Sequence, residues 1–256
     1  MTQLASFDGT ELYYEDEGER AGRPVVLLHG LSSSIQGNWR EPGIWAELVA
    51  AGRRVIGLDA RGHGRSAKPH DPSAYENDAM TTDVGALLDH LGLDQVDLVG
   101  YSMGAGTALQ FAISDSPRLR RLVLGGIGGD PAKWGTDDDG GRSATVRRWL
   151  TGIEATDPDA IEDPVARRAR KIFVARGNDL EAIAALLRSS RKHLSHDMAL
   201  SAVTSPTLVV CGDKDTDPRP LAAALPHGES LILEGDHESV VGNPQLAKSI
   251  VHFLSD

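Results

Sequence analysis

Short continuous apolar runs alternate with segments of helical periodicity along most of this 256-residue chain. The apolar runs are PVVLLHG (24–30), RVIGLD (54–59), QVDLVGYS (95–102) and LRRLVLGGIG (119–128). The segments with helical spacing that separate them cover 44–52, 77–91 and 103–114. Runs without polar alternation are typical of strands buried on both faces. Alternating strands and helices require crossover connections, so the pattern predicts an α/β fold with a mostly parallel sheet.

The first residues show a different pattern. The alternating segments LASF and ELYYED flank the pair Asp8-Gly9. Both residues of such a pair tolerate the positive φ angles of a tight hairpin turn. The chain is therefore predicted to begin with an antiparallel hairpin.

The alternation stops after Gly129 and returns near residue 204. Only helical patterns occur between, such as TVRRWLTGIE and LEAIAALLRSS, and the acidic run 137–139 predicts a solvated loop. Strand patterns then follow at 206–212 and 229–235, before a closing helix. We expect an α/β core of residues 1–129 and 204–256, with 130–203 as a helical cap over the carboxyl edge of the sheet, where such folds bind ligands. The alternative is a second packing layer without a role in substrate choice.

Composition narrows the classes of partner. The net charge of −11 argues against nucleic acid and anionic membrane surfaces, because both require a basic face. The single cysteine, Cys211, excludes an intramolecular disulfide and fits a reduced, cytoplasmic location. We expect no secretory signal and no membrane span, and the pattern leaves the oligomeric state open.

Ser102 ends one buried run and begins a helical one, within the stretch VGYSMGAG. The pattern G-x-S-x-G is weak evidence alone, but a strand-to-helix turn this tight strains the serine backbone and lifts its hydroxyl above the sheet. Gly100 and Gly104 supply the small neighbours that such a turn needs. At the start of the helix, the N–H of Met103 is available to an oxyanion.

A serine nucleophile needs a base, and the base needs an orienting acid. His237 follows the strand predicted at 229–235, and Asp213 and Asp215 follow the strand predicted at 206–212. Asp130 follows the last strand before the insertion and is a further candidate acid. The order serine, acid, histidine is the one that a G-x-S-x-G turn accompanies in α/β sheets.

Five short motifs stand at strand ends in a fixed order. They are His29-Gly30, Asp59-Ala-Arg61-Gly62-His63-Gly64-Arg-Ser66, Gly100-Tyr-Ser102-Met-Gly104, Gly212-Asp-Lys-Asp215 and Gly235-Asp-His237. On these motifs the chain resembles the α/β-hydrolase family over essentially its whole length. The resemblance implies an eight-stranded, mostly parallel sheet with helices on both faces and a helical cap.

The resemblance also implies roles for single residues. Ser102 corresponds to the nucleophile, His237 to the general base and Asp215 to the acid, in preference to Asp213 or Asp130. The N–H groups of Leu31 and Met103 would form the oxyanion hole. A serine nucleophile distinguishes this chain from dehalogenase and epoxide-hydrolase relatives, which carry an aspartate there.

A carboxylic ester or lactone of a small molecule is the expected substrate. Relatives with the same triad cleave carbon–carbon bonds or make peracids, and the fold also serves as a non-catalytic ligand receptor. Trp134 and Trp149 are candidate substrate contacts. The basic residues Arg167, Arg168, Arg170, Lys171 and Arg176 are interpreted as a solvated helix face, with contact to an anionic substrate as the alternative. No residue spacing indicates a metal site or a phosphate-binding loop, so no cofactor is expected.

Overall fold

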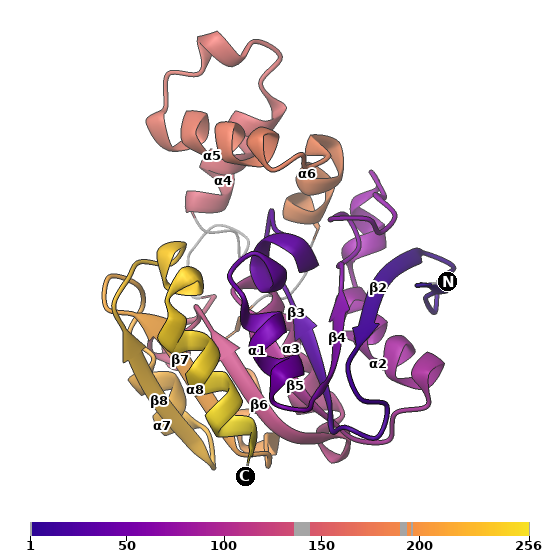
Figure 1. Cartoon of the computed structure of the whole chain (residues 1–256). Coiled ribbons are helices and arrows are strands. Elements are labelled where there is room, and N and C mark those ends of the chain that lie inside the picture. The colour runs from indigo at the N-terminus through magenta and orange to yellow at the C-terminus, as the bar shows by residue number, and fades with distance from the viewer. Residues whose placement is uncertain (1, 136–143, 190–193, 196, 256) are drawn as a thin grey trace.

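The computed structural model describes residues 2–135, 144–189, 194–195 and 197–255. Within them, eight strands form one sheet in the order β1-β2-β4-β3-β5-β6-β7-β8 (Figure 1). The strands are β1 (Gln3–Ala5), β2 (Glu11–Glu17), β3 (Pro24–Leu28), β4 (Arg54–Leu58), β5 (Val96–Tyr101), β6 (Leu119–Gly125), β7 (Thr207–Gly212) and β8 (Gly228–Leu233). The predicted acidic loop at 137–139 lies outside the described residues.

The sheet is mixed but mostly parallel, as the alternation of strands and helices predicts. β1 pairs with β2 and β2 with β4 in antiparallel register, which confirms the predicted hairpin. All pairs from β4 through β8 are parallel. The carboxyl ends of these parallel strands therefore meet at one edge, where the loops that carry the motifs gather.

Helices cover both faces of the sheet, which confirms the predicted fold class. They are α1 (Ile44–Ala50) and α8 (Pro244–Ser255) on one face, and α2 (Ala79–Leu91), α3 (Met103–Ser114) and α7 (Arg219–Ala224) on the other (Figure 1). Along β3, Val26 and Leu28 join the core under α2 and α3, whereas Val25 and Leu27 join the core under α1 and α8. Burial on both faces explains why these strands read as continuous apolar runs.

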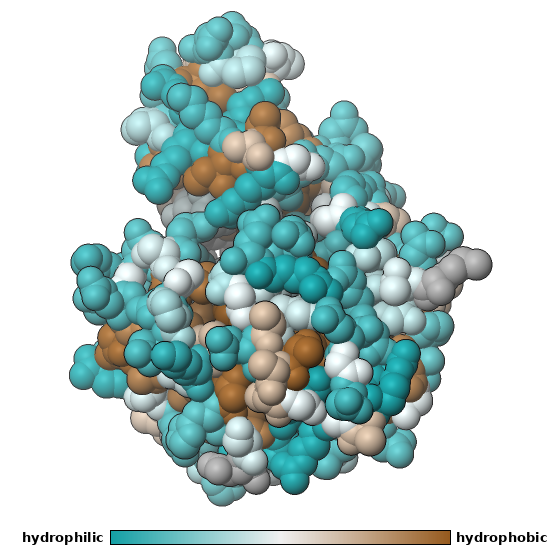
Figure 2. All heavy atoms as spheres, in the orientation of Figure 1, coloured by the Kyte–Doolittle hydropathy of each residue, from teal (hydrophilic) through white to brown (hydrophobic). Residues whose placement is uncertain are grey.

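A helical insertion follows β6 and forms a lobe above the carboxyl edge of the sheet (Figure 1). Its helices are α4 (Ala144–Glu154), α5 (Pro164–Ala175) and α6 (Leu180–Arg188). They share a small apolar core that includes Ile153, Phe173 and Ile183. Hydrophilic side chains cover most of the lobe's outer surface, and hydrophobic ones are visible mainly where it approaches the sheet (Figure 2).

Short helical turns complete the described chain. They are Gln36–Arg40, Pro72–Tyr75, Ser116–Arg118, Pro131–Lys133, Pro158–Ala160, Leu200–Ala202 and Ser239–Gly242. The first is a π-helical turn in the loop between β3 and α1. No helix in the described part of the chain is long and apolar enough to cross a membrane.

Candidate active site

Ser102 occupies a strained turn between β5 and α3. Its φ is 52° and its ψ is −111°, a combination of backbone angles that residues other than glycine rarely adopt. The flanking glycines make this turn possible. A Cβ atom at Gly100 would collide with the carbonyl of Gly104, and one at Gly104 would collide with the carbonyl of Leu28. Helix α3 can therefore lie directly against β3, with the serine hydroxyl at the sheet edge.

Three side chains from three loops form a continuous hydrogen-bonded chain at this edge. The Oγ of Ser102 lies 3.0 Å from Nε2 of His237, and Nδ1 of His237 lies 2.9 Å from Oδ2 of Asp215. The Asp215 side chain is only 11% exposed, and that of His237 is 40% exposed. The hydrogen bond that His237 donates to Asp215 raises the pKa of His237 above its ordinary value, although desolvation acts against it. A carboxylate on Nδ1 leaves Nε2 free to accept the serine proton.

The two other candidate acids point elsewhere. Asp213 is exposed, and its carboxylate accepts the N–H of Gly235 at 2.9 Å. Asp130 is also exposed and accepts the N–H of Ala132 at 3.1 Å, which caps a short helical turn. The structure thus brings Asp215, and neither Asp213 nor Asp130, to the imidazole of His237.

Hydrogen bonds of the buried His29 ring fix the loop after β3. His29 is fully buried, its Nδ1 lies 2.8 Å from the carbonyl of Gly30, and its Nε2 accepts the N–H of Ala60 at 3.0 Å. Because Nε2 accepts an N–H, the ring is neutral and donates from Nδ1, and desolvation lowers its pKa in the same sense. A trans peptide directs its C=O and N–H in opposite directions, so this bond turns the N–H of Leu31 away from His29.

A second side chain fixes the same loop, and α3 begins at the residue after Ser102. Asn38 accepts the N–H of Gly30 through Oδ1 at 2.9 Å. Met103 is the first residue of α3, where the N–H has no acceptor within the helix. Gly30 lies close to Ser102, since a Cβ atom on it would be 3.4 Å from the Cβ of the serine, and Leu31 lines the same cavity as Ser102.

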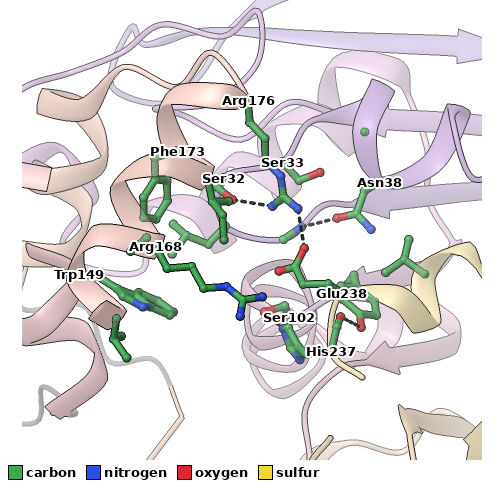
Figure 3. A pocket seen from close by; sticks show the side chains of 18 of the residues that line it. Ser32, Ser33, Asn38, Ser102, Trp149, Arg168, Phe173, Arg176, His237 and Glu238 are labelled. Atoms are coloured by element: carbon green, nitrogen blue, oxygen red, sulfur yellow. Dashed lines mark hydrogen bonds and ion pairs between the residues drawn. The ribbon is translucent and has the colours of Figure 1, made fainter. Parts of the chain in front are cut away.

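A cavity of about 530 Å³ opens above the triad, between the sheet edge and the insertion. Residues from three regions line it. The loop after β3 contributes Leu31, Ser32, Ser33 and Asn38. The helical insertion contributes Trp149, Arg168, Ile172, Phe173 and Arg176, and the segment after β8 contributes His237, Glu238 and Val241 (Figure 3). Its volume is that of a small-molecule site.

The two tryptophans predicted as substrate contacts lie in different places. Trp149, on α4, lines the cavity and meets Phe173 edge to face. Trp134 is absent from the lining that the described residues form. Its indole Nε1 donates to the carbonyl of Gly128 at 3.0 Å, and its ring packs against the core on the α3 side of the sheet.

Sequence reasoning missed several residues that hold the site together. The hydroxyl of Tyr101 donates to the carbonyl of His237 at 2.6 Å, which anchors the histidine loop beside the nucleophile. Arg176 donates to Ser32 Oγ at 2.8 Å and to Glu238 at 2.5 Å, and so joins the insertion to both active-site loops (Figure 3). Tyr101 lies within the serine motif, but nothing local in the sequence indicates contacts over such separations.

The basic stretch on α5 is only partly the solvated face that its composition suggests. Arg168 and Arg176 line the cavity, whereas Arg170 donates to three backbone carbonyls at the end of α4 and after it. In the described part of the chain, no cluster of three or more histidine, cysteine or acidic side chains has the geometry of a metal site.

Comparisons with known proteins agree with this arrangement. Residues 23–175 match the alpha/beta hydrolase fold family. The 2-hydroxymuconate semialdehyde hydrolase of Pseudomonas sp. (strain CF600) is 35% identical over 207 residues, which are 76% of this chain and 71% of that protein. The crystal structure of an enol-lactonase from Burkholderia xenovorans LB400 covers 99% of this chain and 100% of its own, with a TM-score of 0.75 and 26% identity. An esterase from Rhodococcus sp. ECU1013 covers 100% and 99%, with a TM-score of 0.78 and 25% identity. The chain therefore belongs to the alpha/beta hydrolase fold family.

Proposed function

We propose that this hydrolase cleaves a carboxylic ester or lactone of a small molecule through an acyl-enzyme on Ser102. The observation that carries the proposal is the hydrogen-bonded chain from Ser102 through His237 to Asp215, with distances of 3.0 and 2.9 Å, at the base of the cavity. A serine hydroxyl is a weak nucleophile, so a base within hydrogen-bond reach is the decisive requirement.

In the first half of the reaction, Ser102 Oγ attacks the carbonyl carbon while Nε2 of His237 takes the hydroxyl proton. The tetrahedral oxyanion accepts hydrogen bonds from the N–H groups of Leu31 and Met103. Loss of one such donor typically reduces kcat by about 10² to 10³. As the intermediate collapses, His237 returns the proton to the leaving alcohol, and the acyl group remains on the serine.

In the second half, a water molecule attacks the acyl-enzyme and His237 accepts its proton. The carboxylic acid leaves, and Ser102 regains its hydrogen. Asp215 stays ionised throughout, because its role is to hold the imidazole tautomer and to stabilise the imidazolium. In a lactone, the acid and the alcohol would leave as one hydroxy acid.

Similarity to an enol-lactonase and to an esterase supports the ester and lactone class. A second candidate is hydrolysis of a carbon–carbon bond, because a relative with 35% identity is a 2-hydroxymuconate semialdehyde hydrolase. Both reactions would use the same serine, base and oxyanion hole, so the triad does not distinguish them.

The test is a rate comparison on purified protein with p-nitrophenyl esters, five- and six-membered lactones, and 2-hydroxymuconate semialdehyde. We expect kcat/KM for an ester or lactone to exceed that for the semialdehyde by at least about tenfold. The opposite order would favour the second candidate. Absence of turnover on every compound, in a protein that binds one of them tightly, would favour a receptor on the same fold.

Matched variants test whether the turnover depends on Ser102 and His237. Ser102→Ala and His237→Ala are each expected to reduce kcat by about 10³ or more. His252→Ala removes an exposed histidine of α8 and is the control for loss of an imidazole.

A further inference from the structure

The charges around the cavity do not cancel. Besides the triad histidine, the charged residues that line it within the described part of the chain are Arg168, Arg176 and Glu238. Arg176 and Glu238 form an ion pair at 2.5 Å, and a second nitrogen of Arg176 donates to Ser32. This pair is electrically neutral, so Arg168 supplies the remaining formal charge of the lining.

Among the described residues Arg168 has no hydrogen-bond or ion-pair partner, unlike Arg167 and Arg170 on the same helix. Arg167 donates to the carbonyl of Ile161, and Arg170 donates to carbonyls that include that of Gly152. Within the described residues, Arg168 makes no hydrogen bond or ion pair with another side chain or carbonyl. In Figure 3 its side chain extends from α5 in the direction of Ser102, and both residues line the cavity.

Asp236 is an acid close enough to feel the charge of Arg168, and one of its carboxylate oxygens is taken by other donors. Oδ1 of Asp236 accepts the N–H and the hydroxyl of Ser239, at 2.8 and 2.7 Å, and the N–H of Glu238 at 3.1 Å. These hydrogen bonds lower the pKa of Asp236, and the charge of Arg168 contributes least to that shift. The two groups do not form an ion pair, so the guanidinium fork of Arg168 remains open to the cavity.

The apolar wall beside Arg168 shapes the rest of the site. Trp149, Ile172 and Phe173 line the same side of the cavity and suit the carbon skeleton of a small molecule. A guanidinium matches a carboxylate with two parallel hydrogen bonds. In a protein of net charge −11, an anionic substrate needs such a local cation to enter the site.

We infer that Arg168 binds a carboxylate carried by the substrate, so that the enzyme acts on acidic esters or lactones in preference to neutral ones. This inference rests on the proposed function, since it concerns the same cavity and the same nucleophile. It assigns Arg168 to substrate selection and leaves the chemistry at Ser102 unchanged.

Two pairs of esters test the inference, each differing only in the charged group. Mono-4-nitrophenyl adipate and its terminal amide carry the difference on the acyl side. 4-Acetoxybenzoate and 4-acetoxybenzamide carry it on the leaving group. We expect kcat/KM for the acid to exceed that for the amide by roughly tenfold or more in at least one pair, mainly through KM.

Variants on α5 test whether Arg168 causes the preference for the acid. Arg168→Gln is expected to lower kcat/KM for the acid by roughly tenfold more than for the amide, which abolishes the preference, whereas Arg168→Lys should retain part of it. Lys171→Gln removes a charge from an exposed position of α5 outside the cavity lining and is expected to keep the preference. Equal rates on acid and amide in the unaltered enzyme would overturn the inference. A preference that survives in Arg168→Gln would also overturn it.

A binding measurement separates this inference from the proposed function. In Ser102→Ala, calorimetry with the uncleaved esters should show tighter binding of the acid, and Arg168→Gln in that background should remove the difference. Turnover with equal affinity for acid and amide would reject the role of Arg168 alone. Selective binding of the acid without turnover in the unaltered protein would reject the proposed function and retain the carboxylate site.

Discussion

Asp213 and Asp215 stand two positions apart, after the same strand, and have different environments. The carboxylate of Asp213 turns outward to the backbone of Gly235, whereas that of Asp215 is largely buried against His237. Sequence spacing could predict the serine and the histidine, because each directly follows a strand whose end lies at the active edge. It could not separate the two aspartates by local pattern, because their directions depend on how the loop folds back on β8.

The first prediction concerns this acid. Asp215→Asn should reduce kcat by about 10⁴, because an amide favours the wrong tautomer of His237. Asp213→Asn and Asp130→Asn should each retain near-normal turnover, because neither side chain reaches the imidazole. Steady-state kinetics and circular dichroism of the three variants give the comparison. Normal turnover by Asp215→Asn, with loss of turnover in one of the other two variants, would identify that other aspartate as the acid of the triad.

The second prediction is a pH dependence. His237 must be neutral to accept the serine proton, and the hydrogen bond to Asp215 raises its pKa above the about 6.5 of a free histidine. The value of kcat/KM should therefore fall as the pH drops through an inflection above 6.5. In Asp215→Asn the residual activity should show its inflection at lower pH. If the inflection on the acid side stays at the same pH in this variant, the group that titrates in the profile is not His237.

At the scale of elements, the close contact between β3 and α3 positions both Ser102 and the loop after β3. The G-x-S-x-G pattern and its place between a strand and a helix could predict the turn at Ser102. The sequence could not predict which face of α5 meets the cavity, because that depends on how α4, α5 and α6 pack together. The composition of α5 thus predicts a solvated face that includes Arg168, whereas the structure places Arg168 in the cavity lining. The position of Trp134 after β6 likewise predicts a cavity residue, whereas its indole is bonded to the carbonyl of Gly128.

The third prediction tests the close contact. Gly104→Ala should destabilise the protein by about 1 to 3 kcal/mol and reduce activity, because a Cβ there would collide with the backbone of Leu28 and push α3 away from β3. Gly85→Ala is the matched control on α2, where a Cβ would only touch Phe111 at 4.0 Å. That change should raise stability by up to about 1 kcal/mol through helix propensity. Urea unfolding measures both, and equal effects would contradict the close-contact explanation.

At the scale of the whole molecule, a buried charge cluster ties the sheet to the last helix. Asp97, on β5, is fully buried and accepts hydrogen bonds from Arg53 and Arg120. Both arginines also donate to the carbonyl of Leu254 near the end of α8. The alternation of apolar runs and helical segments could predict the sheet and its helices, because strands buried on two faces appear in the sequence as continuous apolar runs. This cluster joins residues that are far apart in the chain, so no local sequence pattern could predict it.

The fourth prediction concerns this cluster. Asp97→Ala should lower the free energy of unfolding by about 3 to 5 kcal/mol, because it leaves the largely buried Arg53 without its counter-ion. Asp89→Ala removes the acid of an exposed pair with Arg118 and should change it by less than about 1 kcal/mol. Unfolding in urea, followed by tryptophan fluorescence, compares the two. Similar midpoints for both variants would mean that the buried cluster adds little to stability.

The central claim is that Ser102 is a nucleophile activated by His237. The most direct measurement is labelling with a neutral fluorophosphonate, located by mass spectrometry of peptides. We predict one equivalent of label on Ser102, none in Ser102→Ala, and labelling at least about 10³-fold slower in His237→Ala. Labelling at another residue, or labelling of Ser102 at an unchanged rate in His237→Ala, would contradict the account.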